Sequence, residues 1–138
     1  MRSVSFTVPG KPQGKGRPRF SSRTGRVYTP SETTDYENKV RLCWSQQTPG
    51  NALNGEIRAD IRAYFHIPKS TAKYKAIKLA EEHTGCQNKP DADNIAKVIL
   101  DSLEGLAFEN DKAITYLTVA KLWGSRPRVE VTLTEADS

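Results

Sequence analysis

The densest group of chemically active side chains lies in the segment Asp91-Ala92-Asp93-Asn94-Ile95-Ala96-Lys97, and a further carboxylate follows at Asp111. Carboxylate oxygens bind hard divalent cations such as magnesium, which are often held by only a few carboxylates together with substrate phosphates. A magnesium ion held in this way activates water and neutralises charge on a phosphodiester. A lysine beside the phosphodiester stabilises developing charge or orients the water. The catalytic residues that we predict are Asp91, Asp93, Lys97 and Asp111, and the three aspartates are the candidate Mg²⁺ ligands.

The spacing supports a shared pocket. In an extended chain, Asp91 and Asp93 would point to the same face, about 7 Å apart. Lys97 lies one helical turn after Asp93 and can reach the same place. The six residues from Gly105 to Asp111 are enough to return the chain to the head of the helix.

A purely structural interpretation of the same residues also exists. Asp93 could cap free N–H groups at the start of a helix, Lys97 could be its ion-pair partner, and Asp111 could be a turn residue. Asp101 and Glu104 share the polar face of the same helix, where we expect both to be solvated.

The distribution of charge indicates the kind of phosphodiester. The formal net charge is +5, and residues 1–30 contain seven basic residues and no acidic one, whereas residues 91–111 contain six acidic residues. A basic surface around an acidic pocket is suited to a polyanion bound at a metal. A solvated basic face that only aids solubility is the alternative. The predicted DNA-binding residues are Lys11, Lys15, Arg17, Arg19, Arg23, Arg26, Lys69 and Lys73.

Hydrophobic periodicity predicts the elements that position these residues. Alternating apolar residues predict strands over 3–9 and 57–67, and His66 then falls on the surface. Residues 10–30, rich in Gly, Pro and charge, predict a loop. A possible capping box at Thr34–Glu37 opens a helix that ends at Thr48-Pro49-Gly50. Ser70 starts a short helix with Tyr74 and Ile77 facing inward.

The second half of the chain continues this pattern. A helix is predicted over 94–104, with Gly105 as its left-handed C-cap. Residues 114–123 predict a buried strand, and residues 129–133 predict a final strand that is its hairpin partner. The 138 residues favour one domain, 1–138. We therefore predict an α/β fold of the α+β type, with a mixed sheet of about four strands and helices packed on it.

Composition excludes several classes of protein. No apolar run approaches the roughly 18–20 residues that span a bilayer, and the N-terminus has no long apolar segment typical of a signal peptide. Cys43 and Cys86 are far apart and form no CxxC motif. A reduced, cytoplasmic protein without membrane contact is the simplest interpretation.

The motif Asp91-x-Asp93-Asn94-x-x-Lys97, with Asp101-x-Leu103-x-Gly105 and Asn110-Asp111-x-x-Ile114, resembles the RusA-type Holliday-junction resolvases. The N-terminal Pro9-Gly10, Pro12 and Arg17-Pro18-Arg19 also resemble that family, as does the order of elements, so the resemblance covers almost the whole chain.

The resemblance implies a specific activity. In the family, the aspartates matching Asp91, Asp93 and Asp111 bind the metal, and the lysine matching Lys97 is required for cleavage. Members form homodimers, depend on magnesium, resolve four-way DNA junctions in recombination and repair, and are often carried by phages or prophages. One departure is Asn88-Lys89-Pro90, where some members have a run of arginines. That difference concerns junction affinity and sequence preference rather than the metal site.

Two other functions are compatible with parts of the sequence. A restriction-type nuclease would share Pro90-Asp91, but it needs a downstream Asp/Glu-x-Lys, and none occurs after residue 91. A non-catalytic basic nucleic-acid-binding module would explain the N-terminal charge. It gives no reason for three acids around a lysine, because acids beside a bound phosphate repel it unless a cation intervenes.

Overall fold

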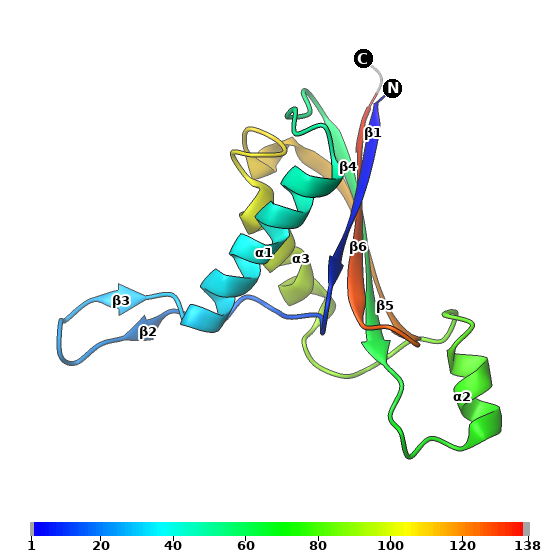
Figure 1. Cartoon of the computed structure of the whole chain (residues 1–138). Coiled ribbons are helices and arrows are strands. Elements are labelled where there is room, and N and C mark those ends of the chain that lie inside the picture. The colour runs from blue at the N-terminus through cyan, green and yellow to red at the C-terminus, as the bar shows by residue number, and fades with distance from the viewer. Residues whose placement is uncertain (1, 137–138) are drawn as a thin grey trace.

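A four-stranded mixed sheet forms the centre of the molecule (Figure 1). The computed structural model describes residues 2–136. The strand order is β1–β6–β4–β5, where β6 is antiparallel to both of its neighbours and β4 is parallel to β5. This confirms the predicted mixed sheet. The strands are β1 (Ser3–Pro9), β4 (Ile57–His66), β5 (Ile114–Gly124) and β6 (Arg128–Glu135).

The two faces of the sheet differ in polarity, as the alternation predicted. In β1, Val4, Phe6 and Val8 are buried, whereas Ser3 and Ser5 are exposed. Each exposed serine hydroxyl is hydrogen-bonded to a threonine hydroxyl of β6, at 3.2 and 2.9 Å. The apolar face therefore carries the core, and the opposite face carries paired hydroxyl and charged groups.

Two helices cover the apolar face, α1 (Ser31–Gln47) and α3 (Ala92–Leu103) (Figure 1). Trp44 of α1 is fully buried and meets Phe6 edge to face, with ring centroids 5.8 Å apart. Ile95 and Ile99 of α3 enter the same core, which includes residues from the sheet and from both helices. One core therefore joins the sheet to α1 and α3. No helix within residues 2–136 is long and apolar enough to cross a membrane.

The N-terminal loop contains more structure than predicted, namely the short strands β2 (Arg19–Phe20) and β3 (Val27–Tyr28), which pair as a hairpin. The capping-box prediction was wrong, because α1 begins at Ser31 after Pro30, without a side-chain cap. Proline fixes a backbone angle compatible with a helix start.

The predicted hairpin between β5 and β6 was also wrong, because β6 lies between β1 and β4. The inward residues of β6 are fully buried, but so is Val8 of the edge strand β1, so burial alone does not identify the neighbours of a strand. The side chains of β5 are only partly covered. β5 is thus an edge strand rather than a buried one, and its Tyr116 side chain is 62% exposed.

The short helix α2 (Lys73–Leu79) projects from the connection between β4 and α3, away from α1 and α3 (Figure 1). The inward orientation predicted for Tyr74 and Ile77 was wrong, since they are 81% and 61% exposed. Only Leu79 of this helix is buried. The surface position of His66 is confirmed.

Candidate functional site

The head of α3 presents two of the predicted carboxylates to solvent. α3 begins at Ala92, two residues before the predicted start, and Asp91 is its N-cap residue. The Asp91 carbonyl accepts hydrogen bonds from the N–H groups of Asn94 and Ile95, at 3.1 and 3.0 Å. The Asp91 side chain makes no capping bond, and both Asp91 and Asp93 are exposed. The cap role considered for Asp93 does not occur, so both carboxylates stand free at the start of a rigid helix.

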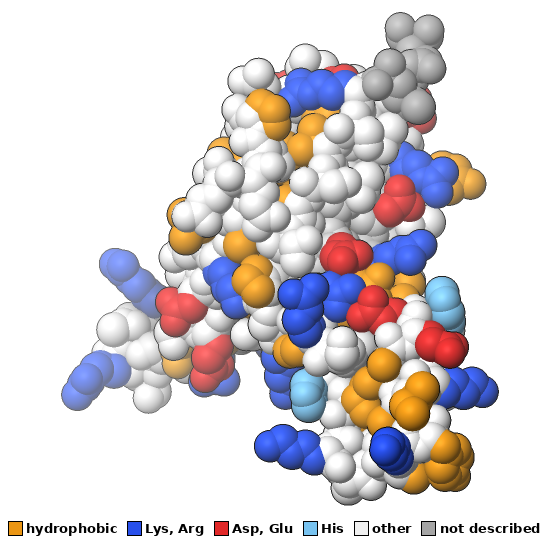
Figure 2. All heavy atoms as spheres, turned by 45° about the vertical axis from the view of Figure 1, so that its right-hand side comes forward, with side chains coloured by type: hydrophobic (Ala, Val, Ile, Leu, Met, Phe, Trp, Pro, Cys, Tyr) orange, Lys and Arg blue, Asp and Glu red, His pale blue; other side chains and the backbone are white. Residues whose placement is uncertain are grey.

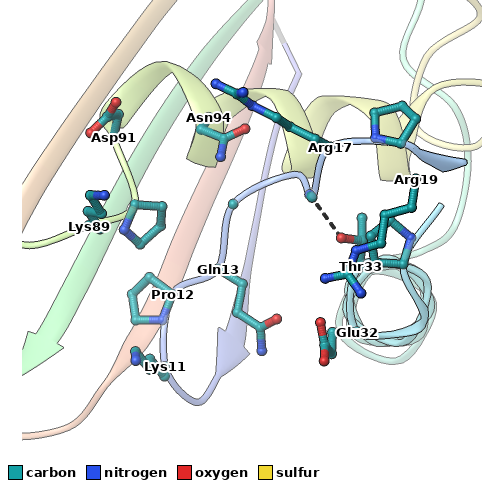
Figure 3. Close-up of a pocket in the computed structure, with 15 residues that line it drawn as sticks. Lys11, Pro12, Gln13, Arg17, Arg19, Glu32, Thr33, Lys89, Asp91 and Asn94 are labelled. Atoms are coloured by element: carbon teal, nitrogen blue, oxygen red, sulfur yellow. Dashed lines mark hydrogen bonds between the residues drawn. The ribbon is translucent and has the colours of Figure 1, made fainter.

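Two hydrogen bonds hold the N-terminal basic loop between this helix head and the start of α1. The backbone N–H of Lys15 donates to the Asn94 side-chain oxygen at 3.1 Å, and the N–H of Gly16 donates to the Thr33 hydroxyl at 2.9 Å (Figure 3). A Cβ at Gly14 would collide with the Asn94 amide, and one at Gly16 would lie 2.5 Å from the Thr33 hydroxyl oxygen. Glycine is therefore required for the loop to approach α1 and α3 this closely.

An ion-pair network reinforces the same attachment. The Lys15 ammonium lies 2.8 Å from a Glu37 carboxylate oxygen of α1 and 3.0 Å from one of Asp101 of α3. Burial lowers the pKa of Lys15, but hydrogen bonds and charge interactions with Glu37 and Asp101 outweigh it, so the net pKa is raised. Lys15 was predicted to contact DNA, whereas here two carboxylates engage its charge. Asp101 is likewise an ion-pair residue rather than a solvated one.

A basic pocket of about 780 Å³ opens between this loop, the start of α1 and the head of α3 (Figure 3). Asp91 lies in its wall, and Glu32 of α1 contributes a second carboxylate on the α1 side. Four cationic side chains line the pocket: Lys11, Arg17, Arg19 and Lys89. The pocket therefore places one predicted metal ligand among several groups that can bind phosphate.

Lys97 and Asp111 share a different and smaller pocket of about 290 Å³, which Asp101 also lines. The backbone N–H of Asp111 donates to the Glu104 carboxylate at 2.9 Å, so Glu104 is a bonding residue and not merely solvated. Asp111 thus lies beside the later turns of α3, not at its head as predicted. The cause is the buried Phe108, whose carbonyl accepts from Gly105 N–H at 2.7 Å and folds the chain back early.

The donor atoms suit a hard cation, but the three predicted ligands do not form one group. Within residues 2–136, no cluster of three or more His, Cys, Asp or Glu side chains has a geometry that could hold a metal. Asp91 and Asp93 are two residues apart at the start of α3, whereas Asp111 lines the pocket along its side. The chain alone therefore offers a pair of carboxylates and a separate third one.

The remaining predicted DNA-binding residues divide into two groups. Arg23 and Arg26 are exposed on the hairpin formed by β2 and β3, which extends outward from the basic pocket. Lys69 and Lys73 are exposed at the start of the α2 region, on the other side of the molecule (Figure 1). Only the first group continues the surface of the pocket.

Sequence reasoning missed four residues that build the site, namely Asn94, Thr33, Glu37 and Lys89. Asn94 stood within the motif but had been given no role, and the others are distant in sequence from the segments that they meet. The spacing Gly14-x-Gly16 was the available signal, since paired glycines beside a cationic loop indicate close backbone approach.

Comparison with known proteins identifies the family of this chain. The family model described as "Endodeoxyribonuclease RusA" matches residues 9–134. A similar protein is "Uncharacterized protein YqaN" of Bacillus subtilis (strain 168), which is 34% identical over 142 aligned positions that cover 100% of both chains. The family match includes the basic loop, α1, the head of α3 and Asp111. The chain therefore belongs to the RusA family and is an endodeoxyribonuclease, a hydrolase that acts on DNA.

Proposed function

We propose that this protein is a magnesium-dependent, structure-selective endonuclease that resolves four-way DNA junctions in recombination and repair. The observation that carries the proposal is the basic pocket at the head of α3, where Asp91 lies among Lys11, Arg17, Arg19 and Lys89. An exposed carboxylate in a cationic pocket lowers affinity for phosphate unless a cation bridges the two. Membership of an endodeoxyribonuclease family supports the same interpretation.

Each residue has a proposed role. The cations of the pocket contact the DNA backbone, which positions the duplex and sets affinity rather than sequence preference. Asp91 and Asp93 at the head of α3 are proposed ligands of Mg²⁺, which would supply activation of water and charge neutralisation when bound. Asp111 is the proposed third ligand, and it would have to move toward this pair when metal and DNA bind, because in the structure it lines the pocket along the side of α3. Lys97 is exposed and close to Asp111, and its ammonium would stabilise negative charge at the phosphate.

A cleavage assay tests the activity. The protein should nick a four-way junction in the presence of Mg²⁺ and should act far more slowly on a linear duplex of the same sequence. Asp91→Asn should reduce cleavage to background while junction binding is retained or strengthened, because a negative charge near phosphate is removed. Junctions that are bound by the wild type but left intact at every Mg²⁺ concentration would favour the alternative, a non-catalytic nucleic-acid-binding module.

A direct binding measurement tests the metal ligands without relying on activity. Titration calorimetry with Mg²⁺ should give weaker binding for Asp93→Asn than for the wild type. Glu109→Gln is a matched control, because Glu109 is an exposed acid close to Asp111 but outside the proposed ligand set. Equal affinity in wild type and Asp93→Asn would remove Asp93 from the set.

We further propose that the active form is a homodimer. Resolution of a junction requires nicks in two strands, and one chain contains one acidic motif, so two sites require two chains. Light scattering with and without junction DNA tests this. A monomer that makes both cuts in one binding event would contradict it.

A further inference from the structure

The hairpin of residues 19–28, here called the arm, is a self-contained projection. Arg19 pairs with Tyr28 and Phe20 with Val27. The turn is closed by hydrogen bonds from Ser21 N–H to the Arg26 carbonyl at 2.9 Å and from Gly25 N–H to the Ser21 carbonyl at 2.8 Å. The arm extends away from the sheet and from α1 and α3 (Figure 1). Its shape is therefore maintained by its own bonds rather than by packing on the body.

The arm exposes an apolar pair. Phe20 and Val27 are 66% and 67% exposed, and their side chains lie on the same face because they are direct cross-strand partners. Tyr28, which pairs with Arg19 on the opposite face of the arm, is about half exposed. Apolar side chains gathered on a projecting element, with nothing from the body covering them, indicate a surface that is buried against a partner.

The charge of the arm identifies the class of partner. Arg19, Arg23 and Arg26 belong to the arm, Arg17 lies two residues before it, and no acidic residue precedes Glu32 in the sequence. Figure 2 shows Lys and Arg side chains on this projection. Packing two such arms together in a dimer would oppose like charges, whereas DNA offers phosphates for the arginines and flat apolar base faces for Phe20. Combined cationic and aromatic contacts of this kind are typical of unpaired or unstacked nucleic acid.

The arm also begins at the candidate site. Arg19 belongs both to β2 and to the wall of the basic pocket. Phe20 is the next residue, roughly 3.3 Å further along the strand. Successive side chains of a strand point to opposite faces, so a base that stacks on Phe20 would lie across the arm from a phosphate bound beside Arg19.

We infer that Phe20 and Val27 form a wedge that stacks on bases at the branch point of the junction, and that this contact gives the enzyme its preference for branched DNA. The inference rests on the proposed function. In linear duplex DNA both faces of each base are covered by neighbouring bases, so the wedge has no site there. At a branch point the stacking partners change, and a base face becomes accessible at a small unstacking cost.

The test is Phe20→Ala, with binding measured on a four-way junction and on linear duplex. Loss of one aromatic–base stack should weaken junction binding by roughly 10- to 100-fold and leave duplex binding nearly unchanged. A junction with 2-aminopurine at the branch should gain fluorescence with the wild type and with Phe20→Trp, but much less with Phe20→Ala. Phe20 is exposed, so these variants should melt at the wild-type temperature.

Two further variants serve as controls. Tyr74→Ala removes an even more exposed aromatic from α2, a different basic element, and should leave the junction-to-duplex ratio unchanged. Arg23→Ala should weaken binding to both DNAs by similar factors, because it removes charge and not stacking.

The outcomes separate the inference from the function on which it rests. If Phe20→Ala keeps the wild-type junction-to-duplex ratio and fluorescence gain, the wedge is refuted while the nuclease assignment stands. If the wild type neither binds nor cuts junctions preferentially, the proposed function fails first. If Phe20→Ala instead changes the mass measured by light scattering, the arm contacts a second copy of the chain, and the inference is overturned.

Discussion

Replacing Lys15 by methionine should destabilise the protein because it removes the cation between two carboxylates. Methionine keeps most of the side-chain volume, so the change is mainly electrostatic. The Lys15 and Glu37 side chains are only 24% and 11% exposed, and the ammonium is 2.8 Å from Glu37 and 3.0 Å from Asp101. The substitution would leave a nearly buried carboxylate at Glu37 without its counter-charge.

The expected loss follows from this burial. Removing one partner of a fully buried pair costs about 3–5 kcal/mol. Because Lys15 is about one quarter exposed and Asp101 can rehydrate, we expect about 2 kcal/mol, equivalent to roughly a 30-fold change in the unfolding equilibrium. The raised pKa of Lys15 means that its stabilisation is complete below the ordinary lysine value and is lost only as pH rises through the higher folded-state value. The difference between wild type and variant should therefore be insensitive to the lysine between pH 6 and 9.

Urea unfolding followed by tryptophan fluorescence measures this loss, since Trp44 is fully buried. Lys11→Met is the matched control, because Lys11 is an exposed lysine of the same loop, and it should lose less than about 0.5 kcal/mol. Adding Glu37→Gln to Lys15→Met should recover much of the loss, because the stranded charge is then removed. A Lys15→Met protein as stable as the Lys11→Met control, or a double variant with no recovery, would refute the reasoning.

Three further outcomes are expected. Lys97→Ala should lower the cleavage rate by about 100-fold, which corresponds to roughly 3 kcal/mol. The melting temperature should not change, because Lys97 is exposed. An unchanged single-turnover rate would mean that Lys97 is only an ion-pair residue. Neutralising Arg17 and Arg19 together should lower the slope of log affinity against log salt by about 0.9 for each phosphate that the protein no longer neutralises. Fluorescence anisotropy across a salt series measures this slope. An unaltered slope would mean that these charges serve only solubility. Hydrogen bonds from Arg128 lower the pKa of Glu82, so Glu82→Gln should destabilise the protein by about 1 kcal/mol near pH 7, and thermal melts should show this difference disappear as pH falls below about 4.

The sequence predicted those parts of the fold that depend on local periodicity. The alternating burial of β1 and β4 and the presence of α1 and α3 were predicted correctly, and so was the left-handed conformation of Gly105. Periodicity shows which side chains face inward, but it does not show which strands are neighbours. The place of β6 was therefore missed, because β6 pairs with β1 and β4, which are distant from it in sequence.

The candidate site was predicted less completely because it depends on distant contacts. The motif identified the head of α3 and its exposed aspartates. The contact of Lys15 with Asn94 joins residues 79 positions apart. The glycines beside Lys15 indicate a close backbone approach, but no local pattern identifies Asn94 as the partner. Similarly, the spacing allowed Asp111 to return to the head of α3. The burial of Phe108 instead turns the chain back earlier, so Asp111 lies beside the later turns of the helix.

The attachment of Gly14 and Gly16 to the two helices has a consequence for the thermodynamics of association. Fixing a flexible backbone costs roughly 1–2 kcal/mol per residue. Around these glycines that entropy is lost when the chain folds, so the cations of the pocket are preorganised and DNA need not order them again. A bulkier residue at either glycine would shift part of this loss to the binding step. Affinity for DNA would then depend on Gly14 and Gly16, although neither residue has a side chain that could contact the nucleic acid.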